Sequence, residues 1–537
     1  MNILLIVPKY NNRVREDYEY TFPMGLGYIS ATLKKAEHNV EIFNLNHYSG
    51  TIKNLVHQRI KNKTYDFIAT GNSAIGYAVT FAIIQAVKEI NPNQKIILGG
   101  PIITTMPESA FKDLQIDYGV IGEGEESVVE LLDYIKKKKS LKKVKGIIFK
   151  ERDKIIITEQ REAPKDLDQL PFPDFEGLDF KKQLNNTHCN TVSYATILDY
   201  PRIYPLLASR SCPFQCTFCY HWAKYRQRSL KNIMSEIRMA IDKYNINFLL
   251  IYDDCFSFDK ERLKLFCKEI KQIMLEKNKE VKWMCQLMVS VVDEELLKML
   301  KDAGCVTISY GFESYNPIVL RSMKKAITPA QIDFAFKTTI KNRLNVQANF
   351  IFGDIAETKE TSEETIKWWK KNSHSQIFLI PVRPYPGSEL YKHCLNKGII
   401  KDEIKFAKEE INATHVPNMT SSMADEELDE LKNKLLKLSA SGEKYRTPLN
   451  IKREKGKIYS VKMKCPYCNF IHEYKNCLIE NKFNFDFQLI CKSCFMRYSA
   501  ASSIRKLLRK NYYLLSPIID PYMKLIRSYK KRQLTKD

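Results

Sequence analysis

Three cysteines lie close together near the middle of the chain, at Cys212, Cys216 and Cys219. Their Cys-x-x-x-Cys-x-x-Cys spacing places three thiolates on one short segment. Three thiolates can ligate three irons of a cubane [4Fe–4S] cluster, whose usual complement is four cysteines. The fourth iron would then remain open to a small molecule. The alternatives are burial as small hydrophobic residues or a zinc knuckle. Pro213 and the polar flanking residues instead favour a loop, and a lone knuckle lacks a fourth ligand.

A second group consists of two Cys-x-x-Cys knuckles, Cys465/Cys468 and Cys491/Cys494, separated by 22 residues. This arrangement is close to that of a four-cysteine zinc site. Aromatic residues between the knuckles predict a short hairpin, so we expect a zinc ribbon. Four thiolates also suit an auxiliary iron–sulfur cluster, which Cys477 could join. A closed four-cysteine site leaves no ligand position open, so either metal would be structural.

The first motif, with Phe218 directly before its last cysteine, resembles the signature of the radical S-adenosylmethionine (radical SAM) enzymes. In that family S-adenosylmethionine chelates the open iron, and the reduced cluster cleaves it to methionine and a 5′-deoxyadenosyl radical. Further segments are similar to the branch of the family with a cobalamin-binding domain; they are Pro23–Tyr28, Gly99–Pro101, Gly122–Glu125, Tyr310–Ser314, Phe352–Thr358 and Tyr385–Tyr391. The resemblance covers about residues 1–400.

The resemblance implies a set of residues around S-adenosylmethionine. Glu313 and Ser314 match a pair that holds the ribose or the methionine end. Asp253 and Asp254 stand where many members bind the methionine ammonium group. From the residues alone, Glu313 could instead pair with a nearby lysine, and the aspartates could cap a helix. The candidate S-adenosylmethionine-binding residues are Phe218, Asp253, Asp254, Gly311, Glu313 and Ser314.

Residues 1–142 alternate short apolar strands with helical stretches, which predicts a doubly wound parallel sheet of the Rossmann-like kind. Such sheets bind ligands beyond the carboxyl ends of their strands, where polar and glycine-rich loops fall in this sequence. Glycines at these places are equally consistent with tight turns. Beside a radical SAM domain they resemble a cobalamin-binding pocket, and its candidate residues are Tyr10, Asn11, Ser73, Gly99, Gly100, Gly122 and Glu123.

The loop after the first strand departs from the pattern of many cobalamin-binding domains. Those domains have Asp-x-His-x-x-Gly there, and the histidine ligates the cobalt. Here residues 9–16 contain no histidine, and the His47-x-x-Gly50 segment follows the second strand instead. If cobalamin binds, we predict that no protein histidine is the lower ligand of its cobalt.

Residues 201–400 repeat strand and helix about six times, with strands expected at 206–209, 248–252, 283–288, 307–312, 348–352 and 377–382. Six such units suit the partial (β/α)6 TIM-type barrel that the resemblance implies. In barrels of this type the site lies at the carboxyl ends of the strands, and the candidate residues fall there. Tyr310, Asn349 and Tyr385 could line a substrate cavity or simply pack.

The chain is therefore expected to be an α/β protein: a cobalamin-binding-like sheet domain, a partial barrel and a small C-terminal metal-bound domain. A chain of 537 residues is long enough for several domains. The boundaries we predict are 1–142 for the first domain, 143–200 for a hairpin and Asp/Pro linker, 201–400 for the radical SAM core, 401–450 for a helical extension, 451–500 for the zinc-ribbon-like domain and 501–537 for a basic tail.

The formal net charge is +23, from 85 Lys and Arg against 62 Asp and Glu. This balance could favour anionic partners, but solvated surface lysines explain it as well, and nucleic acid is not the expected partner. Basic segments in 501–537 could contact an anionic membrane surface. No apolar run is long enough to span a bilayer. Fourteen cysteines without a signal-like N-terminus indicate the reducing cytoplasm.

The function we predict is methyl transfer to an unactivated centre of a small molecule, or of a glycan or lipid precursor, with the [4Fe–4S] cluster, S-adenosylmethionine, cobalamin and structural zinc as cofactors. Low-potential reduction implies an electron donor such as flavodoxin or ferredoxin. Radical cyclisation or oxidative rearrangement on the same scaffold is one alternative, and RNA modification is another. No cysteine precedes Cys189, so the methylthiotransferase subtype, which needs a second N-terminal cysteine trio, is excluded. A non-catalytic binding protein would not need an open cluster.

Overall fold

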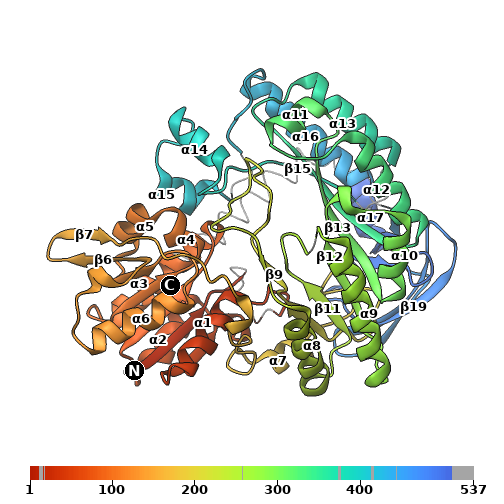
Figure 1. Ribbon diagram of the computed structural model, residues 1–537. Helices are drawn as coiled ribbons and strands as arrows, with labels where there is room; N and C mark the ends of the chain where they lie inside the picture. Colours follow the sequence, from red (N-terminus) through yellow and green to blue (C-terminus); the bar gives the residue numbers. More distant parts are fainter. Residues whose placement is uncertain are drawn as a thin grey trace. The chain divides into compact units, whose positions relative to one another are not determined.

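The computed structural model describes residues 1–10, 16, 18–256, 258–372, 377–412, 416–442 and 444–510. They form two compact units, each assembled from separate stretches of the chain (Figure 1). The first unit comprises Met1–Asn186, Leu207–Ile237 and Arg383–Met419, and the second comprises Thr187–Leu206, Arg238–Val382 and Thr420–Asp537. No helix among the described residues is both long and apolar enough to cross a membrane.

The first unit is built on a seven-stranded sheet with the order β2-β1-β3-β4-β5-β6-β7. Its strands are β1 (Asn2–Val7), β2 (Asn39–Asn44), β3 (Phe67–Gly71), β4 (Ile96–Gly99), β5 (Tyr118–Val120), β6 (Ile147–Glu151) and β7 (Lys154–Ile157). The first five strands are parallel, and the β6–β7 hairpin extends the sheet in antiparallel fashion. The doubly wound parallel sheet predicted from the sequence is thus confirmed.

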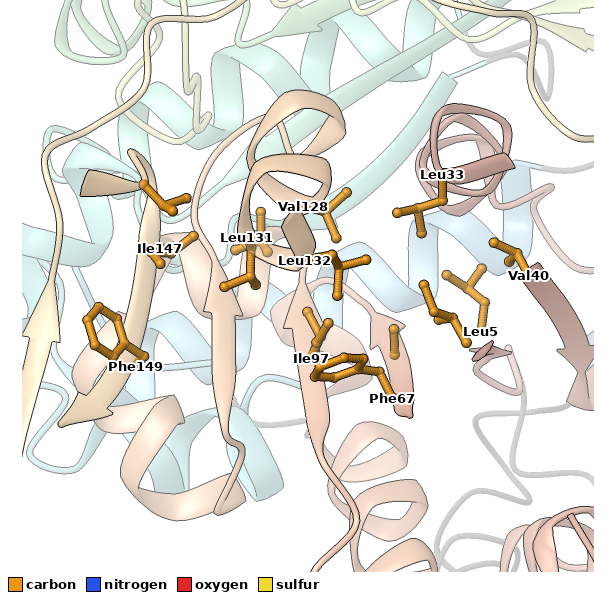
Figure 2. Close-up of a cluster of buried hydrophobic side chains, with 14 residues drawn as sticks. Leu5, Leu33, Val40, Phe67, Ile97, Val128, Leu131, Leu132, Ile147 and Phe149 are labelled. Atoms are coloured by element: carbon orange, nitrogen blue, oxygen red, sulfur yellow. The ribbon is translucent and has the colours of Figure 1, made fainter. Parts of the chain in front are cut away.

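Apolar residues on both faces of the strands explain why this sheet is covered by helices. Five of the six residues of β1 are buried, as expected for a parallel strand with helices on either side. Figure 2 shows Leu5, Phe67 and Ile97 of the strands in one cluster with side chains of α1 (Met24–Lys35) and α6 (Glu125–Lys136). Buried leucines of this kind contribute about 2–5 kcal/mol each when truncation to alanine is the measure.

The second unit contains a six-stranded, fully parallel sheet with the order β15-β14-β13-β12-β11-β8. Its strands are β8 (Ile203–Leu206), β11 (Phe248–Ile251), β12 (Lys282–Gln286), β13 (Cys305–Glu313), β14 (Asn345–Phe352) and β15 (Ile377–Pro381). The main covering helices are α9 (Lys260–Glu276), α10 (Glu294–Asp302), α12 (Pro329–Lys341) and α13 (Lys359–Asn372). This arrangement is the predicted partial barrel.

The first barrel strand lies earlier than the predicted range 206–209, which was wrong by about three residues. Pro205 is inside β8, and a proline argues against a central strand because it cannot donate a ladder hydrogen bond. The proline is tolerated because β8 forms the edge of the sheet. Ser209 and Arg210 belong instead to a separate short strand, β9.

The C-terminal part of the second unit forms two small three-stranded sheets, β17-β18-β19 and β16-β21-β20. Their strands are β16 (Tyr445–Arg446), β17 (Asn450–Lys455), β18 (Ile458–Lys464), β19 (Ile471–Leu478), β20 (Asp486–Ile490) and β21 (Arg497–Ala501). Helix α16 (Asp425–Gly442) precedes them, and α17 (Ser503–Lys510) follows them. The part of the predicted basic tail from residue 511 to residue 537 lies outside the described residues.

This C-terminal ribbon packs against the amino-terminal ends of the barrel strands. Ile490 of β20 belongs to one buried cluster with strand residues such as Phe248 and Met284, together with Ala195 and Ile197 from the segment before β8. The same segment is bonded to the ribbon by its backbone and side chains, for example from Cys189 N to the Asn476 carbonyl at 3.0 Å. The ribbon thus closes the end of the sheet opposite to the predicted site.

Candidate functional site

A cavity of about 1010 Å³ opens at the carboxyl ends of β1, β3, β4 and β5 in the first unit. Six of the seven residues predicted for cobalamin binding line it, and they are Tyr10, Ser73, Gly99, Gly100, Gly122 and Glu123. Asn11, the seventh, lies outside the described residues. The volume is at the upper end for small-molecule sites, so the cavity is large enough for a bulky cofactor.

The glycines of the β4 loop shape this cavity. A Cβ atom added to Gly99 would meet nothing within 4 Å, so it would project into the open space. Gly100 has φ of +82°, and a Cβ there would lie 3.1 Å from the carbonyl oxygen of Asn72. Only glycine adopts that conformation without strain, and the missing side chains let a ligand approach the backbone. Apolar side chains, Leu5 and Leu132 among them, also line the cavity. These features fit a cobalamin nucleotide tail.

His47 is buried away from this cavity. Its Nε2 lies 2.8 Å from the Tyr20 hydroxyl, and burial, together with the charge of Lys182, lowers the pKa of His47 to about 4. No histidine among the described residues lines the cavity. His47 is therefore a core residue of the sheet edge, and the cavity as described offers cobalt no imidazole.

The three-cysteine motif lies on a hairpin loop that also belongs to the first unit. Strands β9 (Ser209–Arg210) and β10 (Arg226–Gln227) pair antiparallel at its base, and residues 211–225 form the loop, which we call the cysteine loop. Cys216 is buried, whereas Cys212 is half-buried and Cys219 is exposed. Phe218 is half-buried. A gradient from buried to exposed thiol suits a site that must admit a small molecule to one iron.

The cysteine loop is fixed by contacts within the first unit. The backbone N–H of Leu390 donates to the carbonyl of Thr217 at 2.9 Å. Gly387, with φ of +90°, lies so close to Tyr220 that any side chain there would overlap the ring. The carboxylate of Glu123 accepts hydrogen bonds from Arg210 and Arg226 at the base of the hairpin. Although burial alone would raise the pKa of Glu123, these arginines lower it below its usual value.

The predicted S-adenosylmethionine residues of the second unit lie at or just after the carboxyl ends of parallel strands, so they share one end of the sheet. Asp253 is buried and Asp254 is exposed, both directly after β11. Glu313 ends β13 with φ of +59°, and its Oε1 accepts from Lys325 Nζ at 3.1 Å. A side chain at Gly311 would occupy the place of this ion pair. The pairing with lysine was the alternative left open by the sequence, and Lys325 was not foreseen.

The tyrosine at 310 is packed in the interior of the second unit. Its ring is buried, and its hydroxyl lies 2.8 Å from Thr339 Oγ1 of α12. Tyr310 also stacks with Phe312, because residues two apart on a strand share a face. The other face of β13 holds Gly311 and Glu313. Tyr385 is partly exposed and Asn349 half-buried.

A buried carboxylate after β14 escaped the sequence prediction. Glu357 accepts from the N–H of Gly353 at 3.2 Å and from the hydroxyl of Thr361 at 3.1 Å. Burial raises the pKa of Glu357 to about 8. Its place four residues after Gly353 in a motif of the resemblance could have singled it out. Its hydrogen bonds fix the turn that leaves the strand.

The four-cysteine group of the ribbon is brought together closely. The sulfur atoms of Cys465, Cys468, Cys491 and Cys494 all lie within 4.8 Å of one another, and the Cys465–Cys494 and Cys468–Cys491 distances are 3.7 and 3.6 Å. Four thiolates at about 2.3 Å from a tetrahedral zinc ion would be separated by about 3.8 Å. Among the described residues, no other group of cysteine, histidine and carboxylate ligands is as tightly gathered. The geometry fits one metal ion better than a multinuclear cluster.

Both knuckles have the same hydrogen-bond pattern. The first cysteine of each receives an N–H from the residue two positions later, Tyr467 or Ser493, at 3.4 Å from its sulfur. Each knuckle then turns through a residue with φ of +63°, Asn469 or Phe495. N–H groups directed at sulfur stabilise thiolates, so the ribbon is arranged for a metal.

Two family models match the chain. Residues 206–369 match the radical SAM superfamily, and residues 13–132 match the B12 binding domain. The chain combines a B12-binding domain with a radical SAM domain. The cavity lies in the first of these, and the three-cysteine motif lies within the second. The matches confirm the resemblance drawn from the motifs, that of a radical SAM domain together with a B12-binding domain.

Relatives in other organisms match most of the length of the chain. An uncharacterized methyltransferase of Pyrococcus horikoshii is 29% identical over 410 residues, which are 74% of this chain and 84% of that protein. An anaerobic magnesium-protoporphyrin IX monomethyl ester cyclase of Cereibacter sphaeroides is 27% identical, over 76% of this chain and 66% of its own length. The structure of the radical SAM methyltransferase TsrM from Kitasatospora setae, with cobalamin and a [4Fe–4S] cluster bound, is similar in fold, with a TM-score of 0.59 and 16% identity over 73% of this chain and 75% of that one.

Proposed function

We propose that this chain is a cobalamin-dependent radical SAM methyltransferase that acts on a small molecule. The observation that supports this most is that the first unit holds both a cavity suited to cobalamin and the cysteine loop. A cluster alone needs no second cavity, whereas methyl transfer through a corrinoid needs both. The relative from Pyrococcus horikoshii and the TsrM structure are both described as methyltransferases.

When bound, the three cofactors would supply an activated methyl group and a one-electron means of removing a hydrogen atom from the substrate. Cys212, Cys216 and Cys219 would ligate the cluster and leave one iron position open. The glycine backbone at Gly99 and Gly100 would bind the nucleotide tail of cobalamin. Glu313 would hold hydroxyl or ammonium groups of S-adenosylmethionine, oriented by Lys325.

A cyclase is the second candidate, because the magnesium-protoporphyrin cyclase is nearly as similar as the methyltransferase. The two functions differ in what happens to the methyl group of S-adenosylmethionine. A methyltransferase converts S-adenosylmethionine to S-adenosylhomocysteine as well as to 5′-deoxyadenosine, whereas a cyclase needs only the second product.

The test is therefore a product analysis under anaerobic conditions. Protein with a reconstituted cluster and bound hydroxocobalamin is reduced, and S-adenosylmethionine is added without substrate. We expect an early release of S-adenosylhomocysteine that requires the corrinoid. Formation of 5′-deoxyadenosine alone would support the cyclase function and contradict methyl transfer.

We further propose zinc for the four-cysteine site, supported by its sulfur–sulfur distances. Because the radical step consumes one electron, a low-potential donor such as flavodoxin or ferredoxin would be a partner. A reducing compartment such as the cytoplasm suits the protein, and no disulfide joins the cysteines that the structure describes. We also propose that the tail contacts an anionic membrane surface. Helix α17 supports this, because its Ile504 and Leu507 are exposed beside basic residues.

A further inference from the structure

The cysteine loop begins and ends at two arginines. Arg210 of β9 and Arg226 of β10 stand directly opposite each other in the antiparallel pair, and their side chains are only 13% and 11% exposed. Like charges that face each other on paired strands repel, and a buried charge requires a counter-charge. The base of the hairpin therefore depends on acidic partners from elsewhere in the unit.

Those partners are Glu123 in the loop after β5 and Glu125 at the start of α6, and both line the cavity. Glu123 accepts from Arg210 Nη1 at 2.7 Å and from both Nη atoms of Arg226. Glu125 accepts from Arg210 Nη2 at 2.7 Å. Two guanidinium groups and two carboxylates thus balance in charge, and we call these four residues the Arg–Glu cluster.

A packing contact joins the same two loops. Gly122 has φ of +84°, and a Cβ atom there would overlap the ring of Trp222, which belongs to the cysteine loop. Gly122, Glu123, Glu125 and Arg210 all line the cavity, whereas Arg226 does not. The cavity wall and the base of the cysteine loop are therefore one connected structure.

We propose that the Arg–Glu cluster couples the binding of the corrinoid to the conformation of the cysteine loop, which rests on the proposed function. Glu123 then acts as a positioning residue and not as a ligand of the cofactor. A corrinoid against the cavity wall would fix the loop after β5 and, through the arginines, both ends of the hairpin. Bound corrinoid thereby favours the loaded iron–sulfur cluster by some factor. By linkage, a loaded iron–sulfur cluster tightens corrinoid binding by that same factor.

The test uses Arg226→Gln, because this change breaks the Arg–Glu cluster without altering a residue of the cavity wall. Glu126→Gln is the matched control, since Glu126 pairs with Arg161 in the same domain at 3.3 Å and does not line the cavity. Hydrogen exchange of residues 211–225 is measured first, without corrinoid. The Kd for hydroxocobalamin is then measured by absorbance, with the iron–sulfur cluster reconstituted and with the iron–sulfur cluster removed.

We expect Arg226→Gln to speed exchange in the loop several-fold, while Glu126→Gln leaves it unchanged. We expect the iron–sulfur cluster to tighten corrinoid binding about tenfold in the unaltered chain and in the control, as for typical coupled sites. In Arg226→Gln we expect it to tighten corrinoid binding less than twofold. If Arg226→Gln fails to fold, Glu123→Gln combined with Arg226→Gln restores the charge balance and should keep the fold but lose the coupling.

Unchanged exchange in Arg226→Gln would overturn the proposal, and so would an equal Kd ratio in Arg226→Gln and the control. A chain that shows the exchange effect but binds no corrinoid would contradict the proposed function and the coupling, while leaving the structural role of the Arg–Glu cluster supported.

Discussion

The two cysteine-rich regions of the chain hold their cysteines in opposite ways. The ribbon gathers four sulfurs within 4.8 Å and directs backbone N–H groups at them, so its ligand set is complete and closed. The cysteine loop offers only three thiols, one of them exposed, and its conformation is held from outside by the Arg–Glu cluster and by Leu390. A structural metal site is built from its own hairpins, whereas a site that must stay open depends on distant parts of the unit.

Loss of one ligand should therefore affect the two regions differently, and the largest effect on chemistry belongs to the loop. Cys216→Ala leaves two ligands, so we expect the [4Fe–4S] cluster to be lost. We expect the rate of 5′-deoxyadenosine formation to fall by at least about 10³-fold. Iron analysis and product assays measure both. The unfolding transition should hardly move, and an intact cluster in this variant would contradict the assignment.

In the ribbon the main effect should be on stability. Cys491→Ser removes a ligand from a closed site, and metal binding of this kind contributes directly to folding. We expect loss of about one metal ion per chain and destabilisation of the ribbon by several kcal/mol. Metal analysis and denaturant unfolding measure the two effects.

Cys477→Ala is the matched control, because Cys477 is buried in the same ribbon but is not one of the four gathered sulfurs. Its metal content should be unchanged. If Cys477→Ala also lost the metal, the auxiliary iron–sulfur cluster would replace zinc as the better account.

Filling the cavity should weaken corrinoid binding in steps that follow side-chain size. Gly99→Ala, Gly99→Val and Gly99→Leu project into the open space next to the β4 loop, so we expect the Kd for hydroxocobalamin to rise progressively, reaching about 100-fold for leucine, about 3 kcal/mol. Absorbance titration measures it. Equal affinity across the series would show that cobalamin does not enter this cavity.

A further effect concerns the pH dependence of stability in the second unit. A carboxyl group whose pKa in the folded chain is raised to about 8 holds its proton more tightly than in the unfolded chain. The free energy of unfolding should therefore fall as pH rises between about 4.5 and 8. Glu357→Gln should remove this fall in the free energy of unfolding, which is of the order of a few kcal/mol. Urea unfolding at pH 5 and pH 8 measures it, and an unchanged slope in the variant would refute the assignment.

Local patterns could be predicted from the sequence, and long-range pairings could not. The cysteine motifs have short, diagnostic spacings, and the apolar periodicity indicated both parallel sheets. The partners of Glu123 are 87 and 103 residues away along the chain, and no local pattern signals such a distance. The edge position of β8, which permits Pro205, likewise depends on the order of the strands. The sequence alone did not determine the partner of Glu313, which in the structure is Lys325.

The most direct test of the central claim is corrinoid retention. The chain is loaded anaerobically with hydroxocobalamin, passed through gel filtration, and the visible spectrum of the protein peak is recorded. We predict about one corrinoid per chain, bound about tenfold more weakly after Cys216→Ala because the iron–sulfur cluster is lost, and not retained in Gly99→Leu. A protein peak with an intact iron–sulfur cluster and no corrinoid would contradict the cobalamin-dependent function.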